Sequence, residues 1–370
     1  IAVAGGSISG LCAGIALRAA GCDVDVFERS SASLESRGAG ILVQPDLIKL
    51  LERYNAPPLP MTWSTHRLYL APGVEEGTLN PWRQPHTSWQ AIYKTLHATY
   101  PAEFYHKGAS VAGFDQTEDG VAVHFEGRDS VDADLLICAD GVHSSIRKRL
   151  LPDATPRYAG YVAWRGTLLE DEVPEELSAL FDDRFAVGSS RSGGHVLNYL
   201  IPGDDGSTAV GQRRLNWVWY ADVAEGAEIS DRLTDREGRR HDLSVGAGMV
   251  PDATVDALKA QAERDLHPSF AKLVQATSTP FLQSIVDLIV PKMAFGRACL
   301  VGDAAMILRP HAGAASAKAA ADAEALAGAI RKTPQDLGTA LKRWETGRLD
   351  AGRSLSQYST ALGRRRASPY

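Results

Sequence analysis

The chain lacks several features that would place it in common protein classes. It has only four cysteines among 370 residues, and none of them forms a Cys-x-x-Cys pair. We therefore expect buried structural thiols, a reducing compartment and no metal site. No apolar run reaches the roughly 18–20 residues that a membrane-spanning helix needs, and no charged leader precedes an apolar segment. These absences predict a cytoplasmic protein without a membrane partner.

An excess of positive charge is also missing. Lysine and arginine number 39 against 45 aspartates and glutamates, a formal net charge of −6. This balance argues against a nucleic-acid partner, which would need a concentrated basic face. The one basic cluster, residues 364–366, stands in the tail, where we expect a solvated helix end. The length suits two domains or one elaborate α/β unit.

The first ten residues, IAVAGGSISG, predict a nucleotide-binding strand, turn and helix. Gly5, Ser7 and Gly10 occupy the positions of the G-x-G-x-x-G fingerprint, whose glycines permit a tight turn and close approach to a pyrophosphate. Ser7 replaces the middle glycine, but it is small and can donate a hydrogen bond. Glu28 follows at the end of the next strand, where a carboxylate binds a ribose diol. The alternative is a Gly-rich turn beside a surface acid, and it leaves this order of elements unexplained.

A second acidic turn ends the apolar strand in DLLICADGVHSSIR. Asp140 and Gly141 lie at its carboxyl end, the edge of a sheet where ligands bind. Ser144 and Arg147 add an N-cap-like hydroxyl and a cation one turn later. A simple strand-ending turn is the alternative.

A third segment, CLVGDAAMILRPHAGAASAKAAADA at 299–323, ends a strand at Gly302 and Asp303. An ionised carboxylate there could accept hydrogen bonds from polyol hydroxyls. Pro310 and Gly313 then open a helix whose positive N-terminus would stabilise a reduced flavin. An ordinary proline-initiated helix is the alternative in isolation. Together with the N-terminal fingerprint, this segment predicts a flavin dinucleotide laid across one domain.

The middle of the chain is rich in strands and aromatic residues and predicts a separate sheet. We assign residues 1–65, 89–157 and 292–330 to an FAD-binding domain, the last of them contacting the flavin. Residues 66–88 and 158–291 form the substrate-binding sheet, and residues 331–370 form C-terminal helices. Within the sheet domain we expect a loop over 223–249 and a helix over 253–275.

Three residues are candidates for acid–base work on a substrate: His311, His195 and Tyr199. Each has a simpler alternative, since His311 could cap a helix and alternating aromatics more often pack a core. The aromatic set of Tyr199, Trp217, Trp219 and Tyr220 could form the wall against a flat substrate. Lys318, inside an Ala-rich helix, is expected to face solvent.

The ordered motifs resemble those of the group A flavoprotein aromatic hydroxylases, the para-hydroxybenzoate hydroxylase class. They span nearly the whole chain: the fingerprint ending in Glu28 and Arg29, the turn at Asp140, and Gly302-Asp303-Ala304-Ala305. The segments GAGI at 38–41, GILVQP at 40–45, YAGYVAWRG at 158–166 and RPHA at 309–312 fit the same family.

This resemblance implies an α/β fold with a Rossmann-like FAD-binding domain of the glutathione-reductase type. An inserted, mainly antiparallel sheet would form the substrate domain, followed by a C-terminal helical region. It implies tightly but non-covalently bound FAD, NAD(P)H as a transient co-substrate, and O2. The implied reaction is hydroxylation of a hydroxylated aromatic or N-heteroaromatic ring, such as a dihydroxypyridine, through a flavin 4a-hydroperoxide. The partner would be this small aromatic substrate, and the sequence leaves a homodimer open.

The resemblance also assigns the cofactor contacts. Glu28 would hold the adenosine ribose, Asp303 the ribityl chain, and the backbone from Pro310 to Ser316 the isoalloxazine. The full expected set is Gly5, Gly6, Ser7, Ile8, Ser9, Gly10, Glu28, Arg29, Gly40, Val43, Gln44, Val111, Asp140, Gly141, Gly302, Asp303, Pro310, Ala312, Gly313, Ala314 and Ala315.

Three positions depart from the family pattern. Met306 stands where a histidine is usual, Ala317 where an asparagine is usual, and Trp89 where an arginine often reaches the pyrophosphate. Two other functions stay open: a flavin-binding redox protein without hydroxylase turnover, and a nicotinamide dehydrogenase. The dehydrogenase leaves Gly302, Asp303 and the inserted sheet unexplained.

Overall fold

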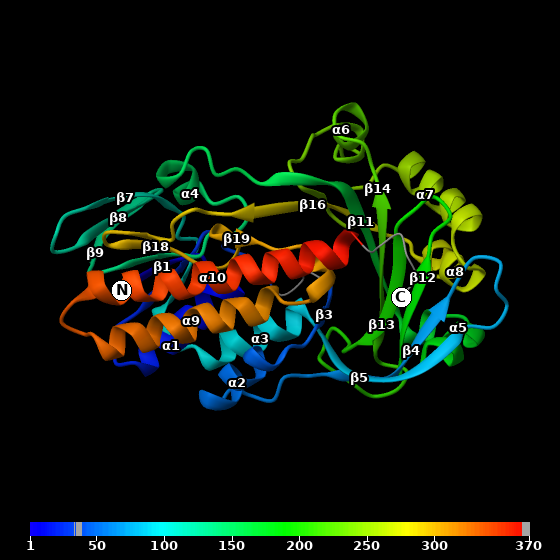
Figure 1. Cartoon of the computed structure of the whole chain (residues 1–370), viewed down its shortest axis with the longest axis horizontal. Helices are drawn as coiled ribbons and strands as arrows, with labels where there is room; N and C mark the ends of the chain where they lie inside the picture. Colours follow the sequence, from blue (N-terminus) through cyan, green and yellow to red (C-terminus); the bar gives the residue numbers. More distant parts are fainter. Residues whose placement is uncertain (33, 35–38, 365–370) are drawn as a thin grey trace.

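The protein has two halves, a sheet flanked by long helices and a second, larger sheet covered by shorter helices (Figure 1). The structure is a computed structural model, and it describes residues 1–32, 34 and 39–364. The chain crosses between the halves several times, so neither half is continuous in sequence.

A mainly parallel sheet forms the centre of the first half, in the order β17-β18-β10-β1-β2-β6. Neighbours from β18 to β6 pair in parallel, and β17 adds an antiparallel edge. The strands are β1 (Ala2–Ala4), β2 (Asp25–Glu28), β6 (Tyr105–Lys107), β10 (Leu136–Cys138), β17 (Ala294–Phe295) and β18 (Ala298–Leu300). Because β18 lies two strands from β1, residues near opposite ends of the chain share one sheet edge.

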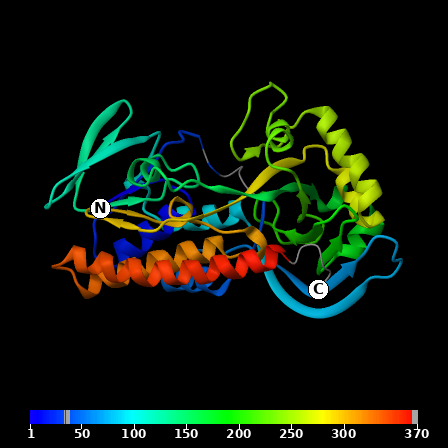
Figure 2. The same cartoon turned by 45° about the horizontal axis from the view of Figure 1, so that its top comes forward.

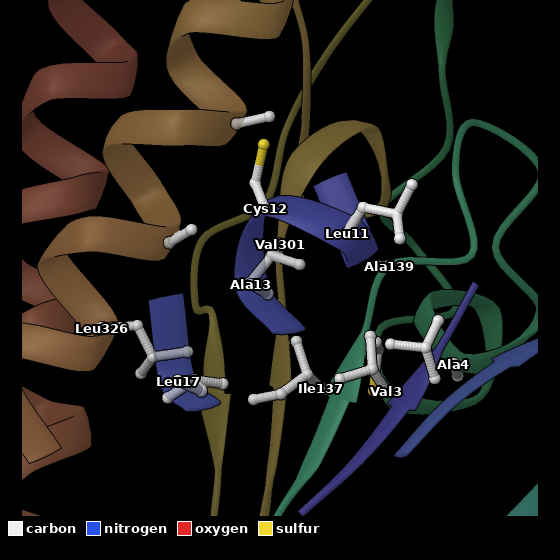
Figure 3. Close-up of a cluster of buried hydrophobic side chains, with 14 of the residues drawn as sticks. Val3, Ala4, Leu11, Cys12, Ala13, Leu17, Ile137, Ala139, Val301 and Leu326 are labelled. Carbon is white, nitrogen blue, oxygen red and sulfur yellow. The ribbon is translucent and has the colours of Figure 1, made fainter. Parts of the chain in front are cut away.

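Three helices stack in order against this sheet. α1 (Ile8–Ala19) connects β1 to β2, α9 (Ala315–Lys332) packs on α1, and α10 (Leu337–Arg364) packs on α9. Figure 3 shows Cys12 and Leu17 of α1 between Leu326 of α9 and strand side chains such as Ile137. Alanine favours the helical conformation and, with its small side chain, lets α9 lie close to both neighbours. The core of this half therefore joins the first and last parts of the chain.

Shorter elements complete the first half. β7, β8 and β9, which lie between β6 and β10 in the sequence, form a separate antiparallel sheet, and a turn through Asp119 and Gly120 joins β7 to β8. The elements are α2 (Pro45–Arg53), α3 (Trp89–Thr99), η1 (Ala102–Phe104), β7 (Val111–Gln116), β8 (Val121–Phe125), β9 (Arg128–Ala133) and α4 (Ser145–Leu150).

The second half is a larger sheet in the order β15-β16-β11-β14-β13-β12-β4-β5-β3, with β19 paired to β16. Among its described strands only β12 and β4 pair in parallel. The strands are β3 (Gly40–Leu42), β4 (Thr62–Leu70), β5 (Thr78–Ser88), β11 (Arg157–Leu169), β12 (Arg184–Ser189), β13 (His195–Ile201), β14 (Arg214–Asp222), β15 (Ser244–Val245), β16 (Phe281–Ile289) and β19 (Met306–Ile307).

The two faces of this sheet have different neighbours, because side chains alternate along a strand. Trp217 and Trp219 belong to a core cluster with residues of the helices that cover one face, and Trp217 Nε1 donates to Thr277 Oγ1 at 2.9 Å. The covering helices are α5 (Glu175–Phe181), α7 (Asp252–Asp265) and α8 (Pro268–Ala276). Val218 and Tyr220 lie on the other face, which looks toward the first half. The expected aromatic wall is therefore divided between the two faces.

Some predicted elements differ from the structure. The predicted loop over 223–249 contains α6 (Ala227–Arg232) and β15, whose short lengths leave no periodic pattern. The helix predicted over 253–275 is two helices, because His267 has extended backbone before Pro268, which begins α8. The sheet also includes β3 and the start of β4, which we had placed in the FAD-binding part.

No helix in the described part of the chain is long and apolar enough to cross a membrane. Within the same ranges no group of three histidine, cysteine or acidic side chains is arranged to hold a metal ion. All four cysteines carry free thiols. Burial raises the pKa of Cys12 and Cys299 far above the usual thiol range, so both are inert packing groups.

The second sheet contains a fully buried histidine that makes its stability depend on pH. His86 stacks on Tyr199 at a centroid distance of 4.5 Å, and its Nε2 lies 2.9 Å from Ser64 Oγ. Burial lowers the pKa of His86 from 6.5 to about 3. The unfolded chain therefore binds one more proton than the folded chain between these values, and stability falls as pH drops from 6.5 toward 3.

We predict that His86 contributes a slope of about 1.4 kcal/mol per pH unit over this window. Urea unfolding of wild type and His86→Gln should be compared between pH 4 and pH 7. The difference in unfolding free energy should shrink as pH falls, because only the wild type has this proton to take up. Parallel curves for the two proteins would contradict the prediction.

Candidate active site

The turn between β1 and α1 requires glycine at two of the three fingerprint positions. Gly5 has φ +106°, and a Cβ there would lie 2.4 Å from the Ala139 carbonyl oxygen. A Cβ on Gly10 would lie 1.8 Å from the Gly5 oxygen. Ser7 has extended backbone with φ −85°, so a side chain is tolerated, which explains the departure from the fingerprint. Its hydroxyl does not cap α1, and the first N–H groups of the helix stay available to a phosphate.

Glu28 is buried at the end of β2 and faces this turn. Its carboxylate accepts hydrogen bonds from the N–H groups of Gly6 and Ser30, both at 2.8 Å. Each oxygen keeps a further lone pair with which a ribose hydroxyl can bond. Arg29 is exposed beside it, and Val111 begins β7 two residues after Ala109, whose N–H donates to the Glu28 carbonyl.

The turn after β10 is tied to the segment that contains Asp303. Ser144 caps α4 by accepting from the Arg147 N–H at 2.9 Å, as the sequence predicts. Arg147 is buried, and its guanidinium donates to the carbonyls of Val142, Asp303 and Ala304. Arg147 thus holds two strand-end segments together, whereas the sequence indicated only a cation one turn after the acidic turn. Asp140 Oδ2 accepts the Ile146 N–H at 3.3 Å.

The third motif meets the first. Gly302 has φ +59°, and a Cβ there would lie 2.1 Å from Ser9 Oγ of α1. Asp303 follows in the short helix η3 (Gly302–Ala304) and is exposed. Desolvation by the surrounding protein raises the pKa of the Asp303 carboxyl. The positive charges of Lys318 and Arg147 act in the opposite direction and lower it.

The strand register aligns these groups along one sheet edge. Ala4 at the end of β1 pairs with Phe27 and with Cys138, and Cys138 pairs with Leu300. Glu28 directly follows its paired residue, and Asp303 lies three residues beyond Leu300. From β2 to β18 is three strand spacings, about 14 Å. An extended dinucleotide can reach along such an edge from Glu28 to Asp303.

The expected flavin-contacting segments also lie together. Gln44 Nε2 donates to the Ala312 carbonyl at 3.3 Å, and Gln84 Nε2 donates to the Val43 carbonyl at 2.9 Å. In the short helix η4 (Pro310–Ala312) the chain turns at Gly313, which has φ +58°. A Cβ on Gly313 would lie 2.7 Å from the Leu42 Cβ. Ala314 then precedes Ala315 at the start of α9. Gly38, also in this predicted turn, lies outside the described residues.

These groups fit FAD on the chemistry of their unused donors and acceptors. Asp140 Oδ1 and Ser316 Oγ are buried without a hydrogen-bond partner among the described residues. Both lie beside expected cofactor segments, where cofactor oxygens and hydroxyls would satisfy them. Glu28 suits the ribose, the α1 N-terminus the pyrophosphate, Asp303 the ribityl hydroxyls, and residues 310–315 the flavin ring.

The second sheet presents three rows of side chains to the first half. The first row is Ala163, Tyr220 and His195; the second, named the central row, is Arg165, Val218 and Leu197; the third is Thr167, Asn216 and Tyr199.

Two segments expected to contact the flavin approach this sheet on either side of the central row. The His311 ring centroid lies 4.5 Å from that of Tyr220, in the first row. Gly40 lies over the third row, because its N–H donates to Asn216 Oδ1 at 2.9 Å. The two outer rows are four residues apart along each strand, about 13 Å. Between them Arg165 and Leu197 remain half-buried.

Two of the three catalytic candidates come together, and the third does not. The rings of His195 and His311 are 5.6 Å apart between centroids, and Tyr161 Oη lies 2.8 Å from His311 Nε2. Tyr199 stacks on His86 in another cluster. Burial raises the pKa of Tyr199 far above its usual range, so this phenol stays protonated and is unsuited to accept a proton. Tyr161 was missed by sequence reasoning, although it alternates with Ala163 on one strand face.

Comparisons with known proteins agree with this geometry. A family model described as FAD binding domain-like matches residues 158–287. The 2,6-dihydroxypyridine 3-monooxygenase of Paenarthrobacter nicotinovorans is 39% identical over 357 residues, 95% of this chain and 87% of that protein. The chain belongs to the group A flavoprotein aromatic hydroxylases.

Solved structures of two hydroxylases share the architecture. The 2,6-dihydroxypyridine-3-hydroxylase from Arthrobacter nicotinovorans has a TM-score of 0.92 and 36% identity, covering 99% of this chain and 92% of that one. Klebsiella pneumoniae HpxO complexed with FAD and uric acid has a TM-score of 0.77 and 25% identity, covering 99% and 88%. This group A hydroxylase is thus an FAD-dependent monooxygenase that uses NAD(P)H and O2. Membership of this family decides against the two alternative hypotheses, a redox protein without hydroxylase turnover and a nicotinamide dehydrogenase.

Lys318 corrects another expectation, because it is buried and not solvent-facing. Its side chain is 3% exposed, and Nζ lies 2.7 Å from Asp322 Oδ2 and 3.3 Å from the Gly302 carbonyl oxygen. Arg348 of α10 donates to Asp322 Oδ1 at 2.6 Å. An ion pair between α9 and α10 therefore supports the Gly302–Asp303 turn. The sequence signal that could have indicated this burial is a single lysine among the alanines of the helix.

Two of the three departures from the family pattern have local explanations. Met306 is fully buried and packs against α10, since a Cβ on Gly352 would lie 2.0 Å from its sulfur. Ala317 is buried at the start of α9. Trp89 begins α3 and stacks on Tyr93 at 5.4 Å between ring centroids. Met306 and Trp89 thus serve packing where the family uses polar side chains.

Gly302→Ala should weaken FAD retention at least tenfold. The left-handed backbone costs a non-glycine residue roughly 1–2 kcal/mol, and the new methyl overlaps Ser9, so the two motifs must separate. Flavin content after dialysis and the dissociation constant for FAD measure the effect. Gly328→Ala in α9, where a Cβ meets open space, is the matched control and should retain flavin. Normal flavin affinity in Gly302→Ala would refute this account.

Lys318→Met should lower the unfolding free energy by about 1–3 kcal/mol, because Asp322 loses one of its two cationic partners and keeps Arg348. Urea unfolding measures the change. Lys332→Met, at the exposed end of the same helix, should stay within about 0.5 kcal/mol of wild type. A Lys318→Met variant as stable as the wild type would count against a stabilising ion pair.

Proposed function

We propose that this enzyme hydroxylates a small N-heteroaromatic ring that already carries hydroxyl groups, such as a dihydroxypyridine, in the cytoplasm. Three observations support this proposal: the identity to a dihydroxypyridine monooxygenase, the free thiols, and the polar aromatic groups around the central row. The central row carries the argument, since it lies between the contacts that two expected flavin-contacting segments make with the sheet, at His311 and at Gly40.

A flat ring over the central row would have different neighbours at its two ends. Val218 and Leu197 offer apolar contact beneath it. His195, Tyr220 and His311 lie toward one end, within a connected set of rings whose centroids are 4.5–5.6 Å apart. Asn216 and Gly40 lie toward the other end. This arrangement positions a planar substrate and keeps water from both sides of it.

The protein's chemical task is limited in such a reaction. FAD, when bound and reduced by NAD(P)H, would activate O2, so that one oxygen atom goes to the ring and the other leaves as water. Removing a proton from a ring hydroxyl makes the neighbouring ring carbons more nucleophilic, and His311 and His195 are placed to receive that proton. Tyr161 holds His311 by the contact at Nε2, so Tyr161 is a positioning residue for this step.

The test is a substrate panel of 2,6-dihydroxypyridine, uric acid and 4-hydroxybenzoate with the purified yellow protein. NAD(P)H oxidation, O2 uptake and product mass are measured for each compound. We expect the greatest stimulation with dihydroxypyridine and a product heavier by one oxygen atom. NAD(P)H oxidation that no ring stimulates, or a preference for uric acid, would overturn the proposal.

A further inference from the structure

Arg165 occupies the central row on β11 and faces the FAD-binding half. It pairs across the sheet with Val218, which belongs to the cluster that contains Tyr161, Ala163 and Tyr220 on this face. Strand alternation therefore directs Arg165 to the side where the substrate is proposed to lie. Its side chain is half-buried, so a ligand in this space can reach its guanidinium.

The charge of Arg165 has no counterion in the described part of the chain. Its Nε is buried and has no hydrogen-bond partner among these residues. Nearby arginines differ: Arg213 pairs with Glu170, Arg214 with Asp204, and Arg309 with Asp287. Burying an unpaired guanidinium donor is costly, and a bound anion would remove that cost.

The positive charge of Arg165 is close enough to Tyr199 to influence the pKa of its phenol. The Arg165 charge acts to lower the pKa of Tyr199, against the larger raising effect of burial. Tyr199 lies in the third row beneath Gly40, so the positive charge acts between the contacts made by Gly40 and by His311. The titratable and charged groups on this side of the sheet and on the segments packed against it are Tyr161, Tyr199, Tyr220, Asp222, His195, His311, and the pairs Arg214–Asp204 and Arg309–Asp287.

We propose that Arg165 binds the negatively charged oxygen of the substrate, so that the enzyme takes a dihydroxypyridine as its singly ionised form and the histidines act on the remaining hydroxyl. This inference rests on the proposed function, because it places the substrate ring over the central row. A guanidinium can direct two N–H donors at one anionic oxygen and cannot itself lose its charge. It would therefore fix the ring's orientation and favour ionisation of the bound ring hydroxyl.

An anionic oxygen can come from an ionised ring hydroxyl or from a carboxylate on the ring. The ring hydroxyl is favoured, because Val218 and Leu197 beside Arg165 are apolar and suit the ring itself. A carboxylate would instead extend the substrate beyond the ring. The two sources predict different responses to substitution of Arg165.

Binding to the oxidised holoenzyme, followed by the change in flavin absorbance, tests the proposal between pH 4 and pH 9. In wild type, 2,6-dihydroxypyridine should bind more tightly as pH rises through the ionisation of the compound itself. Arg165→Gln should bind the ionised form about ten- to hundredfold more weakly and lose this pH dependence. Arg165→Lys should recover part of the affinity, because it keeps the charge but not the paired donors.

Controls separate charge from shape and folding. The neutral 2,6-dimethoxypyridine should bind wild type and Arg165→Gln equally, and Arg157→Gln, at the exposed start of the same strand, should behave as wild type. Equal affinity and pH dependence for dihydroxypyridine in wild type and Arg165→Gln would overturn the proposal. If Arg165→Gln lost binding of 4-hydroxybenzoate but not of dihydroxypyridine, the group bound by Arg165 would be a carboxylate and not an ionised ring hydroxyl. Wild-type turnover tests the proposed function separately, since these measurements require no reaction.

Discussion

The parallel pairing of four strands, β2, β1, β10 and β18, is the constraint on which the rest of this structure depends. It brings Glu28, the Gly5 turn, Asp140 and Asp303 to one edge, although they are spread over some three hundred residues of sequence. The pairing tolerates little change where strands and helices meet. Gly5, Gly10 and Gly302 each lie where a Cβ would overlap a neighbouring residue. The dinucleotide site is thus a consequence of close packing at the end of a sheet.

The same constraint reaches the substrate sheet through the segment after Asp303. β19 pairs with β16, and Arg309 forms an ion pair with Asp287. These contacts fix the position of η4 and of His311 relative to β11, β14 and β13. The large sheet is therefore held firmly against the FAD-binding half, and Figure 2 shows β16 running between the two halves. The distance between flavin segment and substrate face is set by strand pairing and not by a flexible linker.

Buried charge has contrasting roles in the two halves. Lys318, Asp322 and Arg348 neutralise one another between α9 and α10, and Lys318 also donates to the Gly302 carbonyl. Arg147 is satisfied largely by carbonyl oxygens of the turns it joins. Arg165, in contrast, has no counterion among the described residues and faces the proposed substrate position. Groups that support the cofactor site are paired within the protein, whereas Arg165 is suited to pair with a ligand.

The amino-acid sequence alone determined the nucleotide-binding half, because its signals are local. Glycine spacing, an acid at a strand end and an Ala-rich helix each follow from the chemistry of a few consecutive residues, and the predicted family, fold and cofactor are confirmed. The individual cofactor contacts stay predictions. Only the tertiary structure decided that His195 meets His311 while Tyr199 lies apart, that Lys318 is buried, and that Arg165 faces the FAD-binding half. These outcomes depend on strand register and on which helix covers which face, and both arise from contacts between residues far apart in the sequence.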